Sequence, residues 1–177
     1  MSVRRILAFV LAACFALALT AWAAPTTSVY SSLSGCKLVK TGHDWSVSAC
    51  RGVGGYSLQL EYDDARESIS VYTPGRQKHP LEFWRVVSTG FSSVGQKAEW
   101  RVTRKGGKPV PHALIVRFNA SENPEDSSKV TSYLVVAKIT PDKICVTDKI
   151  APSATANEEA RRAADASAAK PCLEAPE

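Results

Sequence analysis

The sequence predicts a mainly β domain, an antiparallel sheet folded as a sandwich or a barrel-like structure, with one C-terminal α-helix. Three observations support this fold class: segments of alternating apolar and polar residues, glycine- and proline-containing turns between them, and an alanine-rich final segment. Alternation is typical of strands because successive side chains point to opposite faces of a sheet.

The clearest strands are residues 56–62 and 68–72, which alternate and are separated by a polar turn at 63–66. This spacing predicts a hairpin. Adjacent glycines at Gly106 and Gly107 predict a second tight hairpin turn, because glycine accepts the positive φ values that such turns require. Further strands are expected at residues 81–87, 98–103, 113–118, 130–140 and 144–146.

The final segment changes from strand to helix character. Residues 156–169 are rich in alanine, and Thr155 with Glu158 fits a capping box, so we expect a helix over about 155–170 that ends before Pro171. Its stripe of small residues would lie close against the sheet but bury little apolar area. A disulfide through Cys172, just beyond the helix, would compensate for this weak docking.

The first 24 residues predict a secretory signal peptide. Arg4 and Arg5 precede an apolar run, which ends in the small-residue cleavage motif Ala21-Trp22-Ala23. The domain would then comprise residues 25–177, periplasmic or secreted, with no stable membrane span after cleavage. Two alternatives stay open: an uncleaved anchor, and a lipoprotein with lipid on Cys14.

Cysteines reinforce the prediction of an oxidising compartment. Cys36, Cys50, Cys145 and Cys172 remain after signal cleavage, and four cysteines allow three pairings. We favour Cys36–Cys50 and Cys145–Cys172 because each closes a short loop, which stabilises a fold by roughly 3 kcal/mol in the chain-entropy model. The alternative, a zinc site, lacks a CxxC pair.

Composition excludes several partners. The formal net charge is +5, of which Arg4 and Arg5 in the signal supply two, and no dense basic run is present. We therefore expect no nucleic-acid partner.

The sequence also lacks a Gly-x-Ser-x-Gly elbow, a Walker loop and a His-Glu-x-x-His motif, so it predicts no catalytic residue, cofactor or metal site.

Few residues suggest chemistry. His43 lies beside Asp44, but we expect this pair in a loop within the Cys36–Cys50 ring. Asp63, Asp64 and Glu67 form an acidic cluster whose spacing does not match a calcium loop.

Trp84 and Trp100 lie on expected strands. If exposed, they would form a sugar- or peptide-binding surface; if buried, they are core residues.

Several segments carry a resemblance across most of the mature chain. They are Gly52–Tyr56, Asp64–Arg66, Phe83-Trp84, Gly90–Ser93, Ala98–Arg101 and Tyr133–Lys138. With them the chain resembles a group of small exported proteobacterial proteins that has no assigned activity. The resemblance implies export and supplies no mechanism. The chain is also similar to periplasmic lysozyme inhibitors in architecture, but Ser34-Gly35 lacks the tyrosine that follows in their inhibitory loops.

The leading functional hypothesis is a non-catalytic module of the cell envelope that binds another protein or a wall component. Two alternatives remain. An inhibitor of a cell-wall hydrolase would use a protruding loop, at residues 31–35 or 88–95. An enzyme with an unrecognised site would bring His43, His79 or His112 near a carboxylate or hydroxyl group.

Overall fold

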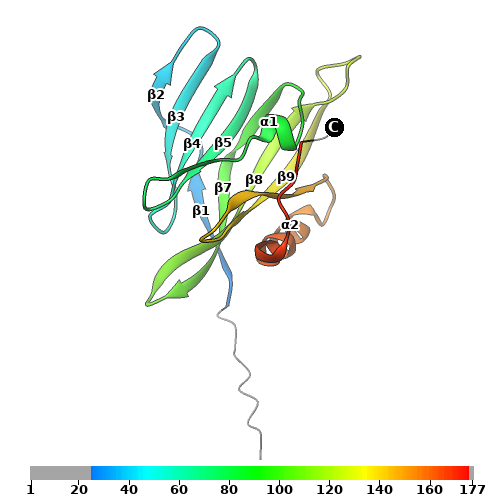
Figure 1. Cartoon of the computed structure of the whole chain (residues 1–177). Helices are drawn as coiled ribbons and strands as arrows, with labels where there is room; N and C mark the ends of the chain where they lie inside the picture. The colour runs from blue at the N-terminus through cyan, green and yellow to red at the C-terminus, as the bar shows by residue number, and fades with distance from the viewer. Residues whose placement is uncertain (1–24, 176–177) are drawn as a thin grey trace, which may run out of the picture.

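Two antiparallel sheets pack face to face (Figure 1) in the computed structural model, which describes residues 25–175. Sheet A contains, in hydrogen-bonded order, β1 (Thr27–Ser32), β7 (Ser92–Lys105), β8 (Lys108–Ser121), β9 (Val130–Ile139) and β10 (Ile144–Ile150). Sheet B contains β2 (Lys37–Thr41), β3 (Trp45–Arg51), β4 (Ser57–Asp63), β5 (Arg66–Tyr72) and β6 (Lys78–Pro80). The predicted fold class, mainly β with a C-terminal helix and two disulfides, is confirmed.

The main core lies between the sheets. Trp100, which is 0% exposed, projects from β7 into this core, and its indole Nε1 donates a hydrogen bond to Ser31 Oγ at 2.9 Å. Its ring lies 6.1 Å from that of Tyr56, which precedes β4. Trp100 is therefore a core residue, and its polar edge is satisfied, as a buried indole requires.

The chain changes sheets twice, first between β1 and β2 and again between β6 and β7. The second connection contains α1 (Phe83–Val86), where we expected a strand over residues 81–87. A hydrogen bond from the Phe83 amide to buried Ser68 Oγ at 2.9 Å holds the start of this turn. The Phe83 ring packs edge-on against Phe118 at 5.5 Å. The helical turn thus buries Phe83, and Leu81 and Val87 are buried on either side of it.

The expectation that His43 and Asp44 lie in a loop within the Cys36–Cys50 ring is confirmed, but the strands on either side of that loop were not predicted. This segment forms the β2–β3 hairpin at the edge of sheet B. All five residues of β2 are exposed, so the strand carries no alternating pattern that sequence could reveal. The hairpin places His43 and Asp44 in its turn.

Both favoured disulfides are present. Cys36–Cys50 links the start of the β2–β3 hairpin to its end, across 14 residues of sequence. Cys145–Cys172 links β10 to the segment that follows the helix, across 27 residues. Within residues 25–175, no helix is long and apolar enough to cross a membrane. The predicted signal peptide, at residues 1–24, lies outside the described residues.

The helix α2 (Ala156–Asp165) lies on the outer face of sheet A (Figure 1) and is followed by a 3₁₀ turn at Ser167–Ala169. Three buried alanines contact apolar side chains of β8 and β9, and these are Ala156, Ala160 and Ala164. The predicted capping box is wrong: the Thr155 hydroxyl donates to Glu159 at 2.6 Å rather than accepting from the backbone. The helix also ends earlier than predicted, because the Ser167 hydroxyl bonds to the Ala164 carbonyl at 2.7 Å.

Two bidentate ion pairs fix α2 to β7. Arg101 donates to Asp165 at 2.9 and 2.8 Å, and Arg161 donates to Glu99 at 2.6 and 3.2 Å. Burial raises the pKa of Glu99, but hydrogen bonds from Arg161 and Ser28 outweigh it, so the pKa is lowered. Burial also raises the pKa of Asp165, but the hydrogen bond and charge of Arg101 outweigh it, so this pKa is lowered as well. Charge pairing therefore supplements the small apolar area that the alanines bury.

These pKa shifts predict loss of stability in acid. A carboxyl group whose pKa is lower in the folded than in the unfolded protein stabilises the fold above its unfolded pKa, and this contribution disappears as pH falls. The ordinary values are 4.5 for Glu99 and 3.8 for Asp165, so the loss should occur below about pH 5. The urea midpoint should therefore fall between pH 7 and about pH 3, and Asp165→Asn should reduce that fall.

A suitable control is Glu158→Gln. The Glu158 carboxylate lies on the same helix, is exposed, and is as far as 3.9 Å from its nearest partner, Arg162. It should keep the wild-type pH dependence. If the urea midpoint of Asp165→Asn fell between pH 7 and pH 3 as much as that of the wild type, the Arg101–Asp165 ion pair would not contribute to the pH dependence of stability.

Candidate binding cleft

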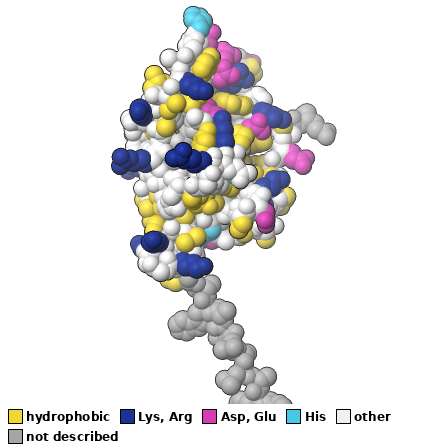
Figure 2. All heavy atoms as spheres, turned by 60° about the vertical axis from the view of Figure 1, so that its left-hand side comes forward, with side chains coloured by type: hydrophobic (Ala, Val, Ile, Leu, Met, Phe, Trp, Pro, Cys, Tyr) yellow, Lys and Arg dark blue, Asp and Glu magenta, His cyan; other side chains and the backbone are white. Residues whose placement is uncertain are grey.

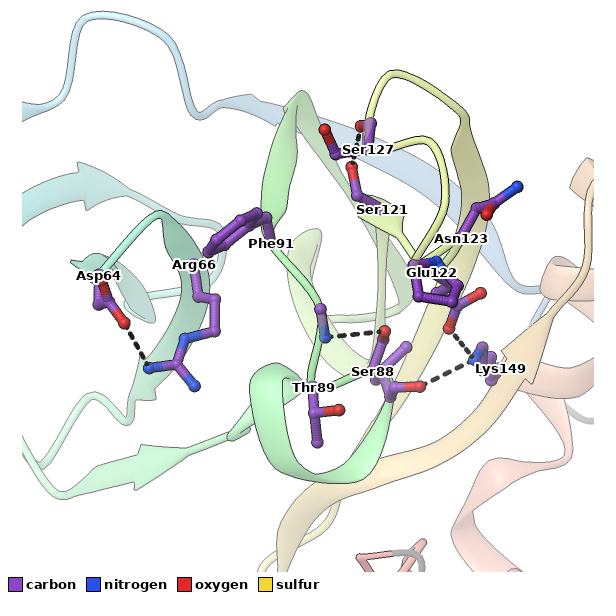
Figure 3. Close-up of a pocket in the computed structure, with 13 residues that line it drawn as sticks. Asp64, Arg66, Ser88, Thr89, Phe91, Ser121, Glu122, Asn123, Ser127 and Lys149 are labelled. Carbon is purple, nitrogen blue, oxygen red and sulfur yellow. Dashed lines mark hydrogen bonds and ion pairs between the residues drawn. The ribbon is translucent and has the colours of Figure 1, made fainter.

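A cleft of about 730 Å³ lies at one end of the sandwich. It is lined by the β4–β5 turn, the connection from α1 to β7, the β8–β9 loop, and Lys149 on β10. Figure 3 shows Asp64, Arg66 and Phe91 on one side and Glu122 and Lys149 on the other, with Ser88 and Thr89 between them. Its volume lies within the roughly 300–1,000 Å³ that is typical of ligand sites.

Backbone hydrogen bonds hold the connection that carries Phe91. The Ser92 amide donates to the Ala65 carbonyl of the β4–β5 turn at 3.0 Å, and the Ser121 amide donates to the Phe91 carbonyl at 2.8 Å. The Val94 amide donates to the Glu67 carboxylate at 2.6 Å. The connection is thus bonded to both sheets.

Phe91 itself projects from this connection and is 57% exposed. A large apolar side chain exposed on a backbone with few degrees of freedom can contact a ligand at low entropic cost.

The opposite wall is built around Lys149. Its ammonium group donates to the Val87 carbonyl at 2.8 Å and to Glu122 at 3.1 Å, and lies 4.0 Å from the centre of the Tyr133 ring. The Tyr133 hydroxyl donates to the second oxygen of Glu122. Lys149 therefore joins the α1 connection to the β8–β9 loop.

These contacts set the protonation of the wall. Burial raises the pKa of Glu122, but the hydrogen bonds from Tyr133 and Lys149 outweigh it and lower the pKa. Burial, and then the bond to Glu122, raise the pKa of Tyr133 above its usual value of 10.0. At neutral pH, Glu122 is an anion and Tyr133 is a neutral donor.

The other charged pair in the cleft is looser. Arg66 donates to Asp64 at 3.4 Å, and the Asp64 side chain is 75% exposed. A guanidinium group has five N–H donors, so this single bond leaves donors for a ligand. The charged side chains that line the cleft are these two pairs, one acid and one base in each, and their formal charges cancel.

The residues predicted from sequence lie elsewhere. Trp100 is buried in the core, so it cannot form the binding surface that exposure would have allowed; Trp84, on α1, is half-buried and does not line the cleft. His43 is 97% exposed in its side chain, 3.6 Å from Asp44. His112 lies 3.4 Å from Asp165 beneath α2, and His79 is on β6. The three histidines are thus separated from one another and from the cleft.

The acidic cluster also separates in space. Asp64 pairs with Arg66, whereas Glu67 accepts the Val94 amide. In the part of the chain that the structure describes, no group of three metal-ligating side chains comes together.

Sequence reasoning did not identify Phe91, Glu122 and Lys149 as site residues. One signal was present: Phe91 is a large apolar residue between Gly90 and two serines, within the segment 88–95 that we considered as a protruding loop. The polar loop at 121–128 was also visible. Their proximity depends on the two crossings between sheets, which the sequence pattern does not show.

A second, smaller cavity of about 530 Å³ lies beside α2. Its charged walls include Glu99 and Arg161, which already bond to each other and fix the helix. We therefore regard the larger cleft as the candidate site. Comparison with protein-family models, with curated proteins and with solved structures found no match for this chain, so its function is argued from the site.

Gly90 gives a test of how the cleft wall is built. A Cβ atom at this position would lie 2.2 Å from the Ser121 carbonyl oxygen, so the connection approaches β8 too closely for any side chain. Gly90→Ala should therefore cost about 1–3 kcal/mol in free energy of unfolding, measured in urea, since overpacking forces the backbone to shift.

The matched control is Gly75→Ala, because a Cβ there would meet nothing nearer than Thr73 Oγ1 at 3.7 Å. It should change the free energy of unfolding by less than about 0.5 kcal/mol. Equal stabilities of the two variants would mean that the connection is not packed against β8 as described.

Proposed function

We propose that this protein is an exported binding module of the cell envelope that holds a cell-wall component in the cleft. The observation that supports the proposal most directly is the exposed Phe91 ring on a connection bonded to both sheets, opposite a polar wall. Ligand sites commonly combine an apolar surface with a few oriented polar groups.

The compartment follows from the predicted signal peptide at residues 1–24 and is compatible with the two disulfides. Disulfides persist in secreted and periplasmic proteins, because the cytosol keeps thiols reduced.

The protonation of the cleft favours binding over catalysis. A general acid or base works best with a pKa near the operating pH. The pKa of Glu122, which lines the cleft, is lowered, and that of Tyr133, which donates to Glu122 from behind, is raised, so both move away from neutrality. Glu122 is therefore suited to a fixed, charged hydrogen-bonding role rather than to proton transfer.

Sedimentation with purified, insoluble peptidoglycan tests the proposal. The exported, disulfide-bonded protein should sediment with the wall material, and Phe91→Ala should weaken binding by about tenfold, as expected for an aromatic contact residue. The control is Val110→Ala, which truncates another exposed apolar residue, 42% exposed and outside the cleft lining. Wild-type protein that stays in the supernatant would contradict the proposal.

A second candidate, inhibition of a wall hydrolase, is favoured by the same observation. Phe91 lies in the segment 88–95, on a connection whose backbone is fixed by hydrogen bonds. The binding loops of protease inhibitors likewise change little in backbone conformation when they bind. Slowed lysozyme activity, together with no sedimentation with peptidoglycan, would favour this second function.

A further inference from the structure

We propose that the cleft recognises the uncharged sugar strand of the wall rather than its charged peptides. This inference rests on the proposed function and identifies the ligand class of the same site. It follows from three properties of the lining: balanced charge, an exposed aromatic ring, and unsatisfied hydrogen-bonding capacity beside that ring.

Charge is the first property. The two acids and two bases of the lining lie beside each other, Asp64 with Arg66 at 3.4 Å and Glu122 with Lys149 at 3.1 Å, so the lining carries no net formal charge. A ligand with a net charge therefore gains no net attraction from the lining to offset the hydration that it gives up. The cleft therefore favours a neutral, polar ligand.

The aromatic ring is the second property. Phe91 presents an apolar surface at one side of the cleft, and Pro124 in the β8–β9 loop adds a second apolar group to its lining. A pyranose ring combines a C–H face, which packs on an aromatic ring through dispersion, with hydroxyl groups around its edge. Phe91 is thus suited to a sugar ring stacked on its face.

Hydrogen-bonding capacity is the third property. Arg66 donates one side-chain hydrogen bond, to Asp64, and lies on the same side of the cleft as Phe91 (Figure 3). Exposed Thr89 contributes a hydroxyl group, which can both donate and accept, between the two walls. On the opposite wall each Glu122 oxygen already accepts one hydrogen bond, from Lys149 or Tyr133, and each has a second acceptor site. Sugar hydroxyl groups both donate and accept, so they match this mixture of donors and acceptors.

Calorimetric titration with a soluble tetramer of N-acetylglucosamine tests the inference. The disulfide-bonded protein should bind it saturably, and the affinity should change little between low and high salt, because a neutral ligand forms no ion pairs to be screened. Phe91→Tyr should keep most of the affinity, since it keeps the ring. Phe91→Leu should lose roughly fivefold or more, since it keeps apolar volume without an aromatic face.

The two proposals fail differently. In one outcome the protein sediments with peptidoglycan, binds free wall peptide in a salt-sensitive way and fails to bind the tetramer. This result would overturn the sugar-strand inference and leave the proposed function standing. Equal affinities of Phe91→Tyr and Phe91→Leu for the tetramer would also overturn it. Absence of sedimentation with peptidoglycan would remove the proposed function itself.

Discussion

The position of the cleft depends on the second of the two crossings between sheets, which takes the chain from β6 in sheet B to β7 in sheet A. Phe83 anchors the start of the crossing by packing on Phe118 in the core, and the Ser92 amide anchors its end on the Ala65 carbonyl. Phe91 lies between these two held ends, and its side chain is exposed. The same crossing brings the Val87 carbonyl to Lys149, which joins the cleft walls. On the face shown in Figure 2, the basic side chains are scattered among hydrophobic, acidic and neutral ones and form no continuous charged patch.

Much of the fold could be predicted from local patterns. The β4–β5 hairpin follows from alternation around a polar turn, and the β7–β8 turn from Gly106 and Gly107, whose φ values are +58° and +78°. Both disulfides were favoured because they close short loops. The helix was visible in its alanines, but not the pairs Arg101–Asp165 and Glu99–Arg161 that fix it, because these join residues more than 60 positions apart.

The rest depends on tertiary context. The apolar run at 81–87 suits a strand as well as a helical turn, and only the contacts of Phe83 decide between them. The edge strand β2 is exposed throughout and has no pattern. The sequence allowed Trp100 to be a surface or a core residue, and only the packing of the two sheets, with the Tyr56 ring 6.1 Å away, encloses it. The cleft combines four segments far apart in sequence, so no local motif marks it.

The central claim is that the cleft wall carrying Phe91 is held in place before any ligand arrives. Amide hydrogen exchange in the disulfide-bonded, ligand-free protein measures this directly. The amides of Ser92, Val94 and Ser121, which donate to Ala65, Glu67 and Phe91, should exchange as slowly as interior amides of β7 and β8. Exchange of these three amides as fast as that of the exposed residues Ser127 to Lys129 would contradict a preformed cleft.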